Sequence, residues 1–72
     1  MNKKNKIKIV VNGKRLTVNA KFSLKNLIEK LKTPISKVAI ELNEEIIDKR
    51  KLKKIFLKNK DKVEIVHFIG GG

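Results

Sequence analysis

The C-terminal run Ile69-Gly70-Gly71-Gly72 is the stretch of this 72-residue sequence with the clearest chemical potential. Glycine has no side chain to pack and loses more conformational freedom on ordering than any other residue. Three glycines therefore add nothing to a core, but they form a thin lead that ends in a carboxylate and can enter a channel where any Cβ would clash. Fully extended, the four residues reach about 14 Å. A frayed terminus is the alternative interpretation, so the rest of the sequence must decide.

Side chains suited to catalysis or metal binding are scarce. Cysteine is absent, which excludes disulfides, thiolate metal sites and a thiol nucleophile. The single histidine, His67, has no carboxylate or nucleophile beside it and is interpreted as an ordinary strand residue. Glu41, Glu44 and Glu45 flank a turn, and nothing near them indicates a nucleophile or a metal. We therefore predict no catalytic residue and no metal site, and interpret the chain as a substrate-like carrier rather than an enzyme.

The net charge of +12 is the most extreme feature of the composition and raises nucleic-acid binding as a hypothesis. Against it, all but two of the 19 basic residues are lysines, and lysine serves base recognition less well than arginine. The lysines are also spread over the whole chain. The densest run comprises Lys49, Arg50, Lys51, Lys53 and Lys54. It is either a solvated face or a docking surface for an acidic partner or nucleic acid, and the composition as a whole disfavours nucleic acid.

No apolar run approaches the roughly 20 residues needed to cross a bilayer. The basic start, Met1 to Lys6, is followed by only a short apolar run that Lys8 interrupts, which is not the pattern of a signal peptide. We expect a cytoplasmic protein with no membrane partner.

The elements that position the glycine tail begin after a flexible polar lead over residues 1–6. Residues 7–11 alternate as a strand, and Asn12-Gly13 is the strongest short-range indication of a hairpin because both residues tolerate positive φ. Residues 16–18 return as the second strand, with Leu16 and Val18 facing inward.

A single amphipathic helix follows. Ser23 is the predicted N-cap, and Phe22 and Leu27 stand at the two positions of a hydrophobic staple. Thr33-Pro34 ends the helix, because proline disfavours helical geometry in the residue before it. The apolar stripe of the helix comprises Leu24, Leu27, Ile28 and Leu31.

The second half of the sequence predicts a third strand over residues 38–42, a turn at 43–45 and a short fourth strand at 46–47. A short irregular or helical crossover then spans residues 48–60. A turn at Asn59-Lys60-Asp61, with Asn59 in the left-handed conformation, leads to the closing strand, Val63 to Phe68. The apolar anchors of the crossover are Leu52, Ile55, Phe56 and Leu57.

This order of elements predicts an α+β fold in which a sheet of about five strands carries one main helix on one face. A single domain spans residues 7–68, and residues 69–72 form a flexible tail. In the last strand, Val63 and Ile65 face the core, which leaves Val66 and Phe68 as an apolar patch beside the tail. Such patches often mark partner surfaces; in the alternative, one of the two side chains lies under the crossover.

Three stretches carry a resemblance to the ThiS sulfur carriers of thiamin biosynthesis, which share the β-grasp, ubiquitin-like fold. They are Val10-Val11-Asn12-Gly13, Val38-Ala39-Ile40 with Leu42-Asn43, and Asp61 through Gly72. The resemblance covers essentially all of the chain from Ile7 to Gly72. It departs from the family where Asn59-Lys60-Asp61 replaces a turn that commonly contains glycine.

The resemblance implies a reactive carboxylate at Gly72, with Gly70 and Gly71 as the tail that carries it. A ThiF-like adenylyltransferase, related to ubiquitin-activating enzymes, would use ATP and Mg²⁺ to form an acyl-adenylate; the chain itself would bind no cofactor. A persulfide donor would then displace AMP and leave a thiocarboxylate for a ThiG-like thiazole synthase. Val66, Phe68 and Ile69 are the predicted partner-binding residues.

Two alternatives remain open. The same carrier chemistry could serve molybdopterin synthesis, tRNA thiolation or conjugation to proteins, although molybdopterin carriers are usually longer. A basic β-grasp RNA-binding module is a different class. It has no use for an exposed terminal carboxylate, and a salt titration with RNA would separate it from a carrier.

Overall fold

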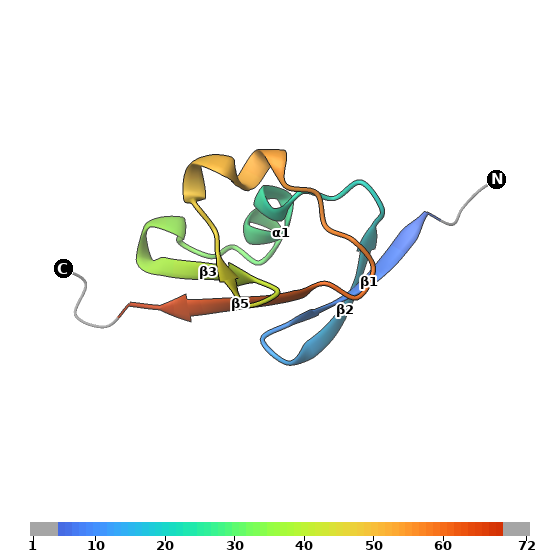
Figure 1. The fold of residues 1–72 in the computed structure, drawn as a ribbon, viewed down its shortest axis with the longest axis horizontal. Coiled ribbons are helices and arrows are strands. Elements are labelled where there is room, and N and C mark those ends of the chain that lie inside the picture. The colour runs from blue at the N-terminus through green and yellow to red at the C-terminus, as the bar shows by residue number, and fades with distance from the viewer. Residues whose placement is uncertain (1–4, 69–72) are drawn as a thin grey trace.

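A mixed five-stranded sheet forms the centre of the fold, with helix α1 and the 3-10 helix η2 on one face and the other face open (Figure 1). The computed structural model describes residues 5–68. The elements are β1 (Lys6–Val11), β2 (Lys14–Asn19), α1 (Leu24–Lys30), η1 (Ile35–Lys37), β3 (Val38–Leu42), β4 (Glu45–Ile46), η2 (Lys49–Lys54) and β5 (Lys62–His67).

The strands lie in the order β2-β1-β5-β3-β4, so the last strand in sequence occupies the middle of the sheet. β5 runs parallel to β1 and antiparallel to β3, and the two hairpins, β1–β2 and β3–β4, are antiparallel. This topology confirms the predicted α+β, β-grasp arrangement. β5 is therefore paired with a strand on each side.

The predicted hairpin turn is present at Asn12-Gly13, whose φ angles are 49° and 82°. Positive φ at both central residues is the type I′ geometry that matches the twist of two antiparallel strands. The same geometry recurs between β3 and β4, where Asn43 has φ 51° and Glu44 has φ 73°.

Helix α1 begins with a capping box. The Asn26 N–H donates to the Ser23 hydroxyl at 3.0 Å, and the Ser23 N–H donates to the Asn26 side-chain oxygen at 3.1 Å. Both bonds satisfy donors that a helix start leaves unpaired. The N-cap predicted from the sequence is therefore confirmed, with asparagine in the position more often taken by glutamate.

Helix α1 ends at Lys30, earlier than the predicted stop at Thr33-Pro34. Lys32 adopts φ 55°, and the Thr33 N–H donates to the Ile28 carbonyl at 3.2 Å, which is a Schellman motif without its usual glycine. Leu31 becomes the C-cap and is 39% exposed. Its predicted place on the buried stripe was wrong, because the chain turns away one residue earlier.

The crossover contains η2 and then an extended segment that pairs with the start of α1. The Leu24 N–H donates to the Ile55 carbonyl at 2.8 Å, and the Leu57 N–H donates to the Phe22 carbonyl at 2.9 Å. Extended backbone alternates its side chains, so Ile55 and Leu57 face inward while Phe56 faces outward and is 56% exposed. Phe56 is thus not the core anchor that the sequence predicted.

The turn before β5 also differs from expectation. Lys60, not Asn59, takes the left-handed conformation, with φ 75°. The Asn59 side-chain oxygen instead accepts a hydrogen bond from the Lys8 N–H at 2.9 Å, and the Lys60 N–H donates to the Lys8 carbonyl at 2.7 Å. Asn59 stabilises the approach to β5 through its side chain rather than through its backbone.

The core lies between α1, η2 and the covered face of the sheet, and includes Val63 and Ile65 of β5 as predicted. No helix within residues 5–68 is long and apolar enough to span a membrane. The buried core residues are Ile9, Val11, Val18, Leu24, Leu27, Ile28, Val38, Ile40, Leu52, Leu57, Val63 and Ile65.

Candidate functional site

The backbone of β5 alternates its hydrogen bonds between its two neighbours. The Asn43 N–H donates to the Lys62 carbonyl at 2.7 Å, and the Phe68 N–H donates to the Lys37 carbonyl at 2.9 Å. Even-numbered residues of β5 therefore bond toward β3, and odd-numbered residues bond toward β1. The bond from Phe68 holds the last residue that the structure describes, just before the predicted tail.

Asn12 extends this pairing beyond the end of β1. Its side-chain oxygen accepts from the Ile65 N–H at 2.7 Å, and its side-chain amide donates to the Ile65 carbonyl at 3.2 Å. The asparagine side chain thereby replaces the next residue of a parallel strand. The sequence predicted Asn12 as a turn residue only, because its contact with β5 spans 53 positions.

Past Ile65, β5 has a free edge on the β1 side. Because His67 is an odd-numbered residue of β5, its backbone N–H and C=O point toward the β1 side of the strand. β1 does not extend that far, so within residues 5–68 these two groups have no hydrogen-bond partner. β5 thus projects toward one end of the molecule with one edge paired to β3 and the other open (Figure 1). His67 itself is exposed on an ordinary strand, as predicted.

Val66 and Phe68 are both exposed, at 51% and 54%, so neither lies buried under the crossover. The Lys49 amine lies 5.3 Å from the centroid of the Phe68 ring, within the roughly 6 Å range of a cation–π contact. The ring is therefore accessible, with η2 beside it. Their partner-binding role stays a prediction, and the other predicted site residues, Ile69 and Gly70 to Gly72, lie outside the described part of the chain.

The open face of the sheet beside Val66 carries an acidic pair. Val66 stands opposite Ala39, and two residues along the strands, on the same face, Glu41 stands opposite Glu64. Like charges directly opposite each other destabilise a sheet slightly, and a chain of +12 places two of its seven acidic residues here. Sequence periodicity put these residues outside the core but did not bring the two glutamates together, because strand register was unknown.

Three other acidic residues are paired with bases. Glu29 lies 3.2 Å from Lys25, Glu44 lies 3.4 Å from Lys62, and Asp48 lies 2.8 Å from Arg50. These pairs are exposed and contribute little individually. Neither Glu41 nor Glu64 takes part in an ion pair within residues 5–68. The two glutamates therefore form an acidic feature of the open face that no basic side chain neutralises there.

η2 carries the dense basic run that the sequence singled out. Asp48 caps it by accepting from the Arg50 N–H at 2.9 Å, and the Arg50 guanidinium binds both carboxylate oxygens. The hydrogen bonds from the Arg50 side chain and backbone lower the pKa of Asp48 from 3.8 to about 2, and the same pair raises the pKa of Arg50. The lysines of the run remain exposed or half-buried, so a solvated face and a docking surface both remain possible interpretations.

No group of three or more metal-ligating side chains occurs within residues 5–68. The site that the structure brings together is thus a held strand, β5, whose exposed end leads into the glycines of the printed sequence.

Comparison with known proteins decides the family. The ThiS family model matches residues 5–72, which includes the glycine tail. This chain belongs to the ThiS family. A ThiS crystal structure from Geobacter metallireducens, described as a thiamine biosynthesis protein, matches with a TM-score of 0.79 and 32% sequence identity, covering 92% of this chain and all of that one. ThiS membership confirms the predicted resemblance and the predicted fold.

Curated relatives of this ThiS-family chain include proteins of very different length. A protein named thiazole synthase from Paramagnetospirillum magneticum is 38% identical over 92% of this chain, which spans only 20% of that relative's length. The sulfur carrier protein ThiS of Bacillus subtilis is 49% identical over 49% of this chain and 53% of its own length. A sequence like this ThiS-family chain thus occurs both within a larger thiazole synthase and in a small carrier.

Proposed function

We propose that this chain is a sulfur carrier that supplies sulfur for thiazole formation in thiamin biosynthesis, with the Gly72 carboxylate as its reactive group. The observation that carries the proposal is the ThiS family match, which runs through the body and the glycine tail without a break. The geometry supports it, because a central strand with an exposed end leads directly into that tail.

The proposed chemistry begins with activation, because a carboxylate is a poor electrophile until one oxygen becomes a leaving group. A ThiF-like adenylyltransferase would use ATP and Mg²⁺. A Gly72 carboxylate oxygen attacks the α-phosphorus of ATP, pyrophosphate leaves, and an acyl-adenylate forms. Gly71 and Gly72 leave the activated carbonyl open, since neither has a Cβ.

Sulfur transfer follows from the acyl-adenylate. The terminal sulfur of a persulfide attacks the Gly72 carbonyl, AMP leaves, and an acyl disulfide forms. A second thiol then reduces that disulfide and releases the thiocarboxylate. The persulfide and the second thiol are both supplied from outside this sequence, which contains no cysteine.

The predicted docking residues are Val66, Phe68 and Ile69, which flank the start of the tail. Val66 and Phe68 are more than half exposed, and large exposed apolar side chains grouped near a reactive segment often mark a partner surface. The free edge of β5 at His67 adds a second means of capture, because a partner strand could pair with it and hold the tail extended.

A ThiG-like thiazole synthase is the proposed acceptor. The relatives named thiazole synthase match nearly the whole of this chain within about a fifth of their own length, so a module of this kind occurs within proteins of that name. Molybdopterin synthesis and tRNA thiolation use the same carrier chemistry and are the alternative destinations for the sulfur.

Reconstitution separates these pathways. The chain, a ThiF-like enzyme, ATP, Mg²⁺, a persulfide donor and a ThiG-like synthase with its small substrates should yield a thiazole, and a variant lacking Gly72 should yield none. Formation of the thiocarboxylate without any thiazole would assign the carrier to another pathway. Thiazole formation by the variant lacking Gly72 would overturn the site.

A further inference from the structure

β2 forms one outer edge of the sheet, and its outward backbone groups can be identified from the register. Val18 of β2 stands opposite Ile7 of β1. Two residues further along, Ala20 stands opposite Asn5, and this pair is hydrogen-bonded, since the Ala20 N–H donates to the Asn5 carbonyl at 2.8 Å. In an antiparallel hairpin the bonded pairs alternate with unbonded ones. The N–H and C=O groups of Thr17 and the N–H of Asn19 therefore point away from β1, toward open solvent. The Asn19 carbonyl also faces away from β1, but it already accepts a hydrogen bond from the Phe22 N–H at 3.2 Å.

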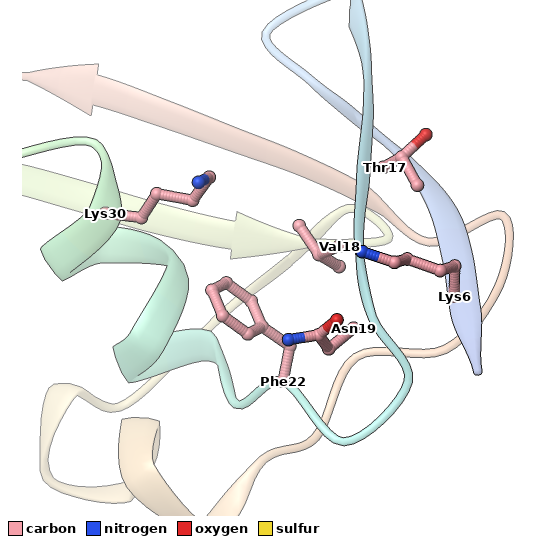
Figure 2. A pocket seen from close by; sticks show the side chains of 6 residues that line it. All are labelled: Lys6, Thr17, Val18, Asn19, Phe22 and Lys30. Carbon is pink, nitrogen blue, oxygen red and sulfur yellow. The ribbon is translucent and has the colours of Figure 1, made fainter. Parts of the chain in front are cut away.

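A groove runs beside this edge, between β2 and α1 (Figure 2). Its cavity of about 110 Å³ is lined by Lys6, Thr17, Val18, Asn19, Phe22 and Lys30. The ring of Phe22 and the side chain of Val18 face each other across it, and Lys30 extends toward Val18 from the end of α1 (Figure 2). A second hollow shares Asn19 and continues along the chain to Ala20 and Lys21.

The surroundings of the groove are uniformly basic. The β1–β2 hairpin and the residues up to 21 contain no aspartate or glutamate. Lys30 adds a further cation from α1, and its neighbour Glu29 is already paired with Lys25. An occupant of the groove therefore meets apolar side chains and several cations together. The cations of the segment are Lys6, Lys8, Lys14, Arg15 and Lys21.

We propose that the β2 edge binds an extended, acidic segment of a partner protein as an added sixth strand. The outward groups of Thr17 and Asn19 supply main-chain hydrogen bonds to the incoming strand. One apolar side chain of that strand enters the cavity between Val18 and Phe22, and its flanking carboxylates meet Lys6 and Lys30. This binding lies beyond the proposed sulfur transfer and involves none of the tail residues.

The chemistry of the edge favours such a peptide over other occupants. A second copy of this chain would set Lys14 and Arg15 against another basic edge, and charged edge residues oppose such pairing. A nucleic acid would satisfy the lysines but not the outward N–H and C=O of Thr17 and the outward N–H of Asn19. An acidic strand satisfies both.

Amide hydrogen exchange followed by NMR tests the proposal. The probe is a synthetic peptide with alternating valine and threonine at its centre and aspartates at both ends. At a peptide concentration 100 times its Kd, the Thr17 and Asn19 amides should exchange about a hundredfold more slowly. The Val18 amide, which already bonds to β1, should change little. A peptide with lysines in place of the aspartates should leave all of these amides unchanged.

Substitutions make the test specific. Thr17→Pro removes an N–H that faces solvent, which an edge strand tolerates, and it should abolish peptide binding; Thr17→Val keeps the N–H and should bind normally. Lys30→Glu should weaken binding at least about tenfold, whereas Lys53→Glu on η2, with the same charge change, should not. Each variant is checked for folding by its NMR spectrum.

Three results would overturn the proposal. The first is peptide binding without slower exchange at Thr17 and Asn19, which would indicate charge attraction alone. The second is equal affinity for Lys30→Glu and the unaltered chain. The third is slow exchange of both amides in the free protein together with a dimeric mass in solution, which would show that a second copy occupies the edge.

Discussion

The Asn12 side chain joins the β1–β2 turn to the strand leading to the tail. Its positive φ forms the turn, and its amide bonds to both backbone groups of Ile65. The sequence was sufficient for the first role, because Asn-Gly between apolar runs has a local meaning. It was insufficient for the second, because a contact across 53 positions depends on which strand lies beside β1.

Replacement of Asn12 tests this second role. Asn12→Gly keeps the turn conformation but removes both hydrogen bonds, and should lower the free energy of unfolding by about 1–2 kcal/mol. Asn12→Asp retains the acceptor for the Ile65 N–H and should lose less. Urea denaturation measures both values. Equal stability of the glycine variant and the unaltered chain would show that the bonds to Ile65 contribute nothing.

Lys32 ends helix α1 at a position where glycine is the usual residue. It holds φ 55° at the position where Schellman motifs usually place glycine. The sequence contains no glycine there, so Pro34 seemed to mark the end, and Leu31 was wrongly assigned to the buried stripe.

Substitution by glycine at this position should therefore stabilise the protein. Lys32→Gly relieves the left-handed conformation and should raise the free energy of unfolding by about 0.5–1 kcal/mol. Lys30→Gly, at the last residue of the helix, should lower it by up to about 1 kcal/mol. Thermal denaturation of the two variants should shift Tm in opposite directions, and a lower Tm for Lys32→Gly would contradict this account of the helix end.

At the scale of elements, β5 and the crossover explain where the sequence predicted well and where it failed. Alternation placed Val63 and Ile65 in the core and Val66 and Phe68 outside it, which the structure confirms. In the crossover, Phe56 was wrongly expected to be an anchor. Its exposure follows from an extended pairing with the start of α1 that only the tertiary fold creates.

These two exposed phenylalanines provide a matched test of partner docking. Phe68 is 54% exposed beside the tail, and Phe56 is 56% exposed beside the start of α1. Phe68→Asp should abolish adenylation by the activating enzyme while the fold stays intact, and Phe56→Asp should leave adenylation unchanged. ATP–pyrophosphate exchange measures the reaction. Full activity of Phe68→Asp would remove Phe68 from the docking surface.

η2 gives a pH-dependent prediction through Asp48. The folded pKa is about 2 against an ordinary value of 3.8, so ionised Asp48 stabilises the fold above pH 3.8, and this contribution is lost as the pH falls through about 2. Asp48→Asn can still cap η2 but cannot form the ion pair with Arg50. The Tm of the unaltered chain should exceed that of Asp48→Asn near neutral pH, and the difference should vanish at the acid end. A constant difference would contradict the assignment.

At the scale of the whole molecule, the β2 edge of the sheet and the open face over β3 and β5 differ in character. The β2 edge is basic and grooved, whereas the open face near β5 carries Val66 and the Glu41–Glu64 pair. The resemblance of short motifs was enough to predict the topology. The groove could not be predicted, because it forms only where the outer strand meets α1.

The central claim is that Gly72 carries sulfur, and intact mass spectrometry tests it most directly. The chain is incubated with ATP, Mg²⁺, a ThiF-like enzyme and a persulfide donor, then reduced and weighed. The account predicts a gain equal to the exchange of one oxygen for one sulfur, located in the C-terminal fragment and absent when Gly72 is deleted. The same gain in the variant lacking Gly72, or no gain despite an adenylated Gly72, would contradict it.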